Sequence, residues 1–248
     1  MLAKEQERTV DQIRAFSSES LGEYDEFGDI DSLPERGWKQ EDLLPRMAKL
    51  RGAEKDFEAG KAFGGIYYDD KQLKQAINLA YCQFADSNGL FPGIFPGLRK
   101  MELDVIRMAR TLMRGDRNVQ GLMTTGGSES ILLAIKAYKE QGKKRGIDEP
   151  EALIPLSAHP AFAKACSYFG IKFVGCQVGF DGRVVVSDVR KKINRNTVVI
   201  VASAPNFASG TVDPVQELAE LAVARGVGMH VDACLGGFLL KLKKKLGH

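Results

Sequence analysis

Short apolar runs alternate with helix-like windows through the second half of the chain. The runs predict strands, whereas the windows between them repeat apolar residues three or four positions apart, which is typical of helices. The expected strands are residues 121–124, 152–156, 172–178, 197–202 and 229–231. The expected helices are residues 128–140, 160–169, 187–192 and 213–226, the last with Asp213 as its N-cap. This alternation predicts an α/β fold with a mostly parallel sheet covered on both faces.

The first part of the chain has a different pattern. Helices are expected at residues 40–58, 70–86 and 98–112, and the last two have strong apolar stripes. The segment before them is polar, with an acidic stretch that contains glycine and proline. We therefore expect an N-terminal helical arm or linker at residues 1–60 and a large domain at residues 61–248.

Composition argues against several classes of protein. The net charge is only +3, and the one dense basic run lies near the C-terminus, whereas nucleic-acid-binding proteins usually gather Lys and Arg into a stripe. The four cysteines form no C-x-x-C motif and the three histidines are far apart, so no zinc-site spacing is present. No apolar run approaches the roughly 18 residues of a membrane span. We expect no metal, no nucleic acid, no transmembrane segment and a cytoplasmic location.

A glycine-rich turn lies where an expected strand passes into a helix. Its residues Gly126, Gly127 and Ser128 let the backbone approach an anion, and the first turn of the helix offers unpaired N–H groups and a positive dipole end. These features suit a phosphate monoester. An ordinary strand-to-helix turn with Ser128 as the N-cap is the alternative.

Polar residues also follow the ends of other expected strands. Asp232 ends a short apolar strand, where a carboxylate needs a partner such as a protonated pyridine nitrogen. His159 could stack on a planar ring, and Ser203 lies at an equivalent strand end. The alternatives are a capping aspartate, a loop histidine and a turn hydroxyl. Together with the phosphate turn, these positions point to pyridoxal 5'-phosphate as the cofactor.

Four motifs make the chain recognisable. They are residues 94–102, 125–131, 157–159 and 230–238, the last reading His-Val-Asp-Ala-Cys-Leu-Gly-Gly-Phe. From about Leu33 onward the chain resembles the sphingosine-1-phosphate lyase family, which is of the group II decarboxylase type. The resemblance implies a type I pyridoxal-phosphate-dependent transferase-like large domain and a homodimer. It also implies retro-aldol cleavage of phosphorylated long-chain bases to a fatty aldehyde and phosphoethanolamine. An amino-acid decarboxylase is the alternative enzyme.

The resemblance assigns roles to individual residues. Gly126, Gly127 and Ser128 would hold the cofactor phosphate, His159 would stack on the ring and Asp232 would pair with its nitrogen. Tyr67 and Asn88 match positions near the substrate, with a packed aromatic and a helix cap as their alternatives. Phe91 and Gly93 stand where the family usually has His and Asp, so phosphate recognition or proton transfer can differ here.

A further departure concerns the Schiff-base lysine. The family has an Asp-Thr/Ala-His-Lys segment some tens of residues after the aspartate, and the printed sequence has no counterpart up to His248. We expect a large domain that is incomplete at the C-terminus and inactive alone, a catalytically silent fragment unless a complementary C-terminal chain joins it. The resemblance also implies an endoplasmic reticulum location for eukaryotic members, through an anchor that is absent from this sequence.

Overall fold

The computed structural model describes residues 32–52, 54, 57–61, 65–66 and 70–242. The chain divides into two compact units, Met1–Tyr68 and Asp69–His248. The first contains helix α2 (Gln40–Gly52), which is shorter than the expected helix at 40–58. The expected arm at 1–60 and large domain at 61–248 stay predictions.

The second unit begins with two helices before its sheet. These are α3 (Lys71–Phe84) and α4 (Pro96–Leu112). The Asp70 carboxylate accepts the Leu73 N–H at 2.8 Å, so it caps α3 as aspartate commonly does. No residue of α3 or α4 is buried, although both helices carry apolar stripes. The apolar pattern therefore predicted the two helices but not the exposure of their apolar faces.

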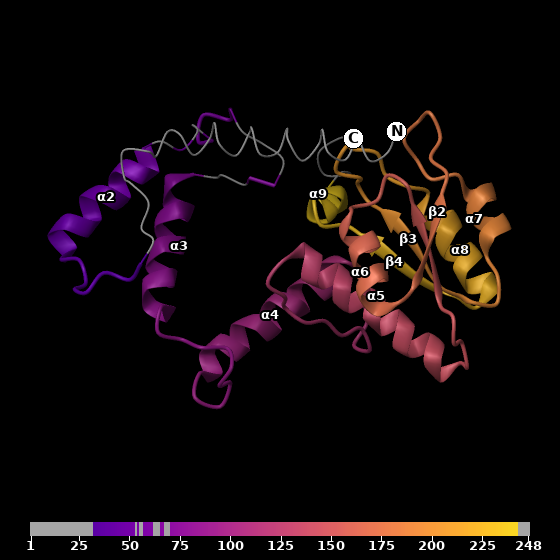
Figure 1. Cartoon of the computed structure of the whole chain (residues 1–248), viewed down its shortest axis with the longest axis horizontal. Coiled ribbons are helices and arrows are strands. Elements are labelled where there is room, and N and C mark those ends of the chain that lie inside the picture. Colours follow the sequence, from indigo (N-terminus) through magenta and orange to yellow (C-terminus); the bar gives the residue numbers. More distant parts are fainter. Residues whose placement is uncertain (1–31, 53, 55–56, 62–64, 67–69, 243–248) are drawn as a thin grey trace. The chain divides into compact units, whose positions relative to one another are not determined.

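A parallel sheet of four strands forms the centre of the second unit (Figure 1). The strands are β1 (Glu151–Pro155), β2 (Lys172–Cys176), β3 (Thr197–Ser203) and β4 (Gly228–Asp232), in the order β2-β1-β3-β4. All three strand pairs are parallel, which confirms the predicted fold class. The expected strand at 121–124 was wrong, because that segment pairs with no strand in the described part of the chain.

Helices cover both faces of the sheet (Figure 1). On one face lie α5 (Gly127–Lys144) and α6 (Ala161–Phe169), and on the other lie α7 (Val186–Lys192) and α8 (Val215–Arg225). A short helix, α9 (Gly237–Leu242), follows β4. The sequence predicted the positions of α5 to α8 to within a few residues, whereas α9 was not predicted.

Strand β3 shows how side-chain alternation builds two apolar cores. Its seven residues are all buried. Val199 and Val201 pack with α5 and α6, whereas Ile200 and Ala202 pack with α8. Burying a side chain of the size of Val or Ile stabilises the fold by about 1.5–3 kcal/mol before entropy is counted, so β3 is the main apolar link between the layers.

Tyr138 of α5 contacts the beginning of β4. Its hydroxyl donates to the Met229 carbonyl, and its ring occupies the space that a Cβ at Gly228 would need. Burial raises the pKa of the Tyr138 hydroxyl, so it stays protonated and remains a donor. Position 228 therefore has to be glycine while this ring is in place.

Two termini of helices also bear on the sequence reading. Gly170 and Gly226 end α6 and α8 with φ of 61° and 62°, the left-handed conformation expected of a terminal glycine. Asp213 does not cap α8, so that prediction was wrong: the residue before the helix is Pro214, and no side chain caps the helix. In the described residues, no helix combines the length and the apolar character of a bilayer span.

Candidate active site at the carboxyl edge of the sheet

The carboxyl ends of β3 and β4 lie side by side. Ser203 and Asp232 are partners in the strand register, and the Ala204 N–H donates to the Asp232 carbonyl at 2.8 Å. Ser203 lies two positions after Val201, which packs with α5 and α6, and Asp232 lies two positions after His230, the register partner of Val201. Because side chains of a strand alternate, Ser203 and Asp232 are on the face that α5 and α6 cover. The structure thus places Asp232 on the side of the sheet where α5 begins.

The chain changes direction at β1. From β1 it passes to β2 on one side and then returns to β3 on the other, so the strand order reverses between β1 and β3. Asn206, which is buried, donates from its side-chain amide to the Ser157 carbonyl and so ties the two loops together. Ligands of open α/β sheets bind at such a position.

His159 lies in the loop after β1 and is exposed. Its Nδ1 accepts the Ala161 N–H at 3.1 Å, at the start of α6. A neutral His159 therefore carries its proton on Nε2, and the ring is fixed to the helix by its other nitrogen. This geometry leaves one ring face and one N–H available at the sheet edge.

The turn before α5 is held by side-chain hydrogen bonds. Glu129 accepts from the Thr125 N–H at 2.6 Å and from its hydroxyl at 2.7 Å. These two hydrogen bonds lower the pKa of the Glu129 carboxyl, and the bond from the Thr125 hydroxyl has the larger effect. Thr124 and Ser130 share a hydroxyl hydrogen bond of 2.7 Å, and the hydroxyl that accepts in this pair is free to donate to the Gly126 carbonyl, which lies within reach of both. The turn therefore keeps its shape without a ligand.

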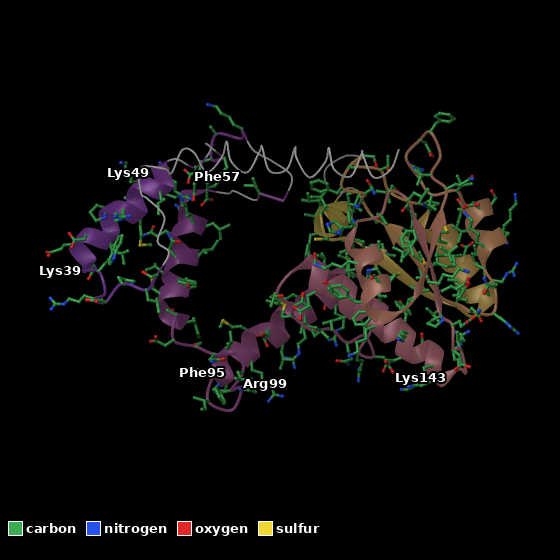
Figure 2. The ribbon with its side chains drawn as sticks, viewed as in Figure 1. Lys39, Lys49, Phe57, Phe95, Arg99 and Lys143 are labelled. Carbon is green, nitrogen blue, oxygen red and sulfur yellow. The ribbon has the colours of Figure 1, made fainter. Side chains whose placement is uncertain are left out.

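The first amides of α5 have no acceptor. The N–H groups of Gly127, Ser128 and Glu129 lie in the first turn of the helix, so no carbonyl of the helix is placed to accept from them. None of the three has a partner in the part of the chain that the structure describes. The Ser128 hydroxyl, also exposed, has none there either. At the other end of the helix, the last turn is basic, with Lys143 labelled in Figure 2. Charge of this kind at the C-terminus complements the helix dipole, and its positive end lies at Gly127.

The α5 turn and the Asp232 loop are in contact. A Cβ built on Gly127 would lie 3.3 Å from the Cys234 sulfur. Cys234 in turn donates its N–H to Oδ1 of Asp232 at 3.0 Å. The free amides of α5 and the half-buried Asp232 carboxylate are therefore joined through a single residue. They converge as an anion site and a cation site on one edge of the sheet.

Asp232 has one satisfied oxygen. The Cys234 N–H occupies Oδ1, and Oδ2 has no hydrogen-bond partner among the described residues. A half-buried carboxylate gains from a cationic donor such as a pyridinium N–H. The donors at α5 and this open acceptor fit a molecule that carries a phosphate and a protonated ring nitrogen.

Asp213 is a site residue that the sequence reading missed. Its buried carboxylate accepts the Ser203 N–H at 2.7 Å and the Val184 N–H at 2.8 Å. It fixes the backbone of Ser203 and hence the end of β3. The Asp-Pro pair suggested a helix cap, and no local pattern indicated that the side chain turns toward the sheet.

The expected substrate residue Asn88 is not brought to this edge. Asn88 lies in the loop after α3, where its Oδ1 accepts the Leu90 N–H at 2.8 Å, and no contact in the described structure joins it to the strand ends. Phe91 and Gly93 lie in the same exposed loop. Tyr67 lies outside the described residues.

A cavity of about 610 Å³ adjoins the other side of the α5 turn. Apolar side chains of α4, the 119–124 segment and α9 form most of its wall, among them Val105, Ile106, Met113, Leu122 and Phe238. It offers few hydrogen-bonding groups. The polar chemistry of the site lies at the strand ends instead.

Comparison with known proteins agrees with this arrangement. The family model described as class-V aminotransferase matches residues 107–237, which include α5, the whole sheet and the Asp232 loop. The chain belongs to the class-V aminotransferase family. Enzymes of this family use pyridoxal 5'-phosphate, and the parallel sheet with flanking helices is that of fold-type I enzymes.

Sphingosine-1-phosphate lyases are homologues of this class-V aminotransferase chain. Sphingosine-1-phosphate lyase 1 of Mus musculus is 41% identical over 219 residues, which cover 88% of this chain and 39% of that protein. A probable L-aspartate decarboxylase of Pyrococcus furiosus is 33% identical over 216 residues, 87% of this chain and 56% of that protein. The chain spans about two fifths of the length of the mouse relative.

A solved structure gives the same result. The sphingosine-1-phosphate lyase of Burkholderia pseudomallei superposes with a TM-score of 0.84 at 35% identity, over 90% of this chain and 53% of that one. The likeness in fold therefore extends beyond the residues that the family model matches.

Proposed function

We propose that this chain carries the cofactor-binding part of a pyridoxal-phosphate-dependent lyase of the sphingosine-1-phosphate lyase type. Its reaction is the cleavage of a phosphorylated long-chain base to a fatty aldehyde and phosphoethanolamine. The observation that carries the proposal is the contact between Gly127 and Cys234, which joins the α5 turn to the Asp232 loop. The higher identity to sphingosine-1-phosphate lyases than to the aspartate decarboxylase favours the lyase over an amino-acid decarboxylase.

The α5 turn holds the phosphate in this proposal. Gly127 and Ser128 donate their backbone N–H groups, and Ser128 adds its hydroxyl. Gly126 lets the phosphate approach, because no atom lies within 4 Å of the Cβ position built on it. The turn is already shaped by the Glu129–Thr125 hydrogen bonds, so binding costs little ordering.

Asp232 and His159 orient the ring. Oδ2 of Asp232 accepts the ring N–H and keeps that nitrogen protonated, as an ion pair at a half-buried site favours the charged form. His159 stacks on the ring while its Nδ1 stays bound to the Ala161 N–H. Ser203 lies beside Asp232 in the strand register and borders the ring. When bound, the cofactor supplies an electron sink for the substrate carbon that is cleaved.

A further polypeptide takes part in the active site in this proposal. It is a second copy of the chain or a complementary C-terminal chain. The Schiff-base lysine would come from the complementary chain, because we assign that role to no lysine of the printed sequence. Two observations support it: the mouse relative is more than twice as long, and β4 has a neighbouring strand on one side only within the described residues. The proposal also includes Tyr67 and Asn88 as substrate residues. It further includes a cytoplasmic location and a domain boundary at residue 60.

Binding of pyridoxine 5'-phosphate tests the cofactor site. This compound has the ring nitrogen and the phosphate but no aldehyde, so its affinity reports the contacts at α5 and Asp232 without lysine chemistry. We expect calorimetric binding, at least about tenfold weaker binding to Asp232→Asn, and still weaker binding of pyridoxine, which lacks the phosphate. Equal affinities for pyridoxine and its phosphate would contradict the phosphate role of the turn.

The reaction is tested with a phosphorylated long-chain base. The printed chain is assayed alone and mixed with the C-terminal half of the Burkholderia relative, and phosphoethanolamine is quantified. We expect product only in the mixture. Carbon dioxide from L-aspartate, with no phosphoethanolamine, would support the decarboxylase instead.

A further inference from the structure

His230 is a half-buried histidine that none of the roles above uses. It lies on β4 two positions before Asp232, so both side chains project from the same face of the sheet. Its ring meets the ring of Phe162 on α6 edge to face, with centroids 5.6 Å apart. Phe162 is fully buried. His230 therefore lies between the apolar core and the proposed ring-binding carboxylate.

Neither ring nitrogen of His230 has a hydrogen-bond partner within the described ranges. An imidazole beside an apolar ring and without a fixed partner favours its neutral form. Burial accordingly lowers the pKa of His230, and the negative charge of Asp232 opposes that effect. Burial and the Asp232 carboxylate thus act on the same imidazole in opposite directions.

The titratable groups of the apolar core on this face of the sheet carry no charge near neutral pH. On α5, the Tyr138 hydroxyl donates to Met229 and burial raises its pKa. On α6, burial raises the pKa of the Cys166 thiol to about 11. Neighbouring β3 presents Val201 on this face, and α8 packs on the opposite face of the sheet. Among the described residues, Asp232 is thus the one charged group whose field acts on His230.

We propose that His230 is a positioning residue that sets how strongly Asp232 holds a cationic ring. A neutral His230 leaves Oδ2 of Asp232 to the ring N–H. A protonated His230 competes for the same carboxylate and weakens the ring contact. The inference about the ring rests on the proposed function, whereas the coupling of the two side chains does not.

Histidine NMR tests the coupling without any cofactor. The chain has three histidines, so substitution of each by Gln assigns the three imidazole signals. We expect the titration midpoint of His230 to move to lower pH by about half a unit or more in Asp232→Asn, because one nearby negative charge is removed. Asp188→Asn is the matched control: it removes a carboxylate of α7 that binds Lys192, and the midpoint should stay in place.

Binding of pyridoxine 5'-phosphate tests the effect on the ring. We measure its affinity at about pH 7.5 and at about pH 5.5 for the wild type and for His230→Gln. The loss of affinity at the lower pH should be at least about threefold larger for the wild type than for His230→Gln. The ligand phosphate titrates in both proteins, so only the difference between them reports His230. His230→Asn serves as a second variant if the Gln variant does not fold.

The outcomes separate the two proposals. A His230 midpoint that is the same in the wild type and in Asp232→Asn overturns the coupling, whatever the cofactor does. Coupling without any binding of pyridoxine 5'-phosphate supports the electrostatic coupling of His230 and Asp232 but overturns the proposed function, and with it the effect on the ring. Binding with the same pH dependence in wild type and His230→Gln overturns the positioning role.

Discussion

The ends of β3 and β4 each have an aspartate carboxylate, and the two are used differently. At β3, Asp213 is buried and receives two backbone N–H groups, one for each oxygen. At β4, Asp232 is half-buried and receives one, the Cys234 N–H, on Oδ1. The first carboxylate has completed its hydrogen bonds within the protein. The second keeps an acceptor for something else.

This difference separates a structural carboxylate from a binding one. A saturated carboxylate holds strand and loop together, and its removal leaves buried amides unpaired. A half-buried carboxylate with an open acceptor adds little to the fold but can hold a cation. Burial alone would have pointed to Asp213 as the functional residue, whereas the count of filled acceptors points to Asp232.

The strongest way to break the comparison is to remove each carboxylate in turn. Asp213→Ala should lower the free energy of unfolding by roughly 2–5 kcal/mol, because the Ser203 and Val184 N–H groups lose their acceptor in the core. Asp232→Ala should lower it by less than about 1 kcal/mol, since the exposed Cys234 amide can bind water. Urea unfolding followed by circular dichroism measures both. Similar losses in the two variants would mean that Asp232 is structural as well.

A second prediction concerns the spacing between α5 and the β4 loop. Gly127→Val should weaken pyridoxine 5'-phosphate binding by at least about tenfold, because the side chain meets the Cys234 sulfur and moves the amides away from Asp232. Gly127→Ala should have a smaller effect, and adding Cys234→Ala should restore most of it. Calorimetry on the single and double variants measures this. If the double variant binds no better, the contact with Cys234 is not what limits position 127.

A third prediction uses pH. The pKa of His230 is lowered in the fold from its usual 6.5, chiefly by burial. The unfolded chain therefore takes up a proton at higher pH than the folded chain does, and acid favours unfolding. The contribution of His230 to the free energy of unfolding should be constant above about pH 6.5 and fall by up to about 1.4 kcal/mol per pH unit below it. His230→Gln should flatten this slope, and an unchanged slope would assign it to other groups.

The smallest effect is on thiol reactivity. Burial raises the pKa of Cys166 and of Cys176 to about 11, so both should resist iodoacetamide at about pH 8. Exposed Cys82 and Cys234 should react. Pyridoxine 5'-phosphate should slow Cys234 alone, because its sulfur lies beside Gly127. Mass spectrometry of the labelled peptides gives the four rates, and equal slowing of Cys82 would indicate a global effect.

The sequence indicated those features that depend on local chemistry. A glycine pair before an apolar helix and an acid after an apolar strand are local signals, and parallel topology brings both to one edge. Helices α5 to α8 were predicted for the same reason, since their apolar spacing, and for α6 and α8 the terminal glycine, lie within each segment.

Features that depend on distant partners were not predictable. The 121–124 segment has the composition of a strand, but a strand needs a neighbour, and none pairs with it in the described residues. Asp213 looks like a helix cap because the N–H groups that donate to it, those of Val184 and Ser203, are far from it in sequence or lie on another element. The Gly127–Cys234 contact joins residues more than a hundred positions apart, and glycine alone gave no sign of it.

The contact of Tyr138 with the start of β4 has a consequence for the opposite end of that strand. Side chains of a strand alternate, so a slip of one residue against β3 would turn Asp232 away from α5 and toward α8. The Tyr138 ring packs against Gly228, and its hydroxyl donates to the Met229 carbonyl. Both contacts are possible in only one register of β4 against β3. An aromatic ring at the amino end of β4 thereby decides which way the acid at its carboxyl end faces, and substitutions there can abolish ligand recognition from the far end of the strand without changing any residue that binds the ligand.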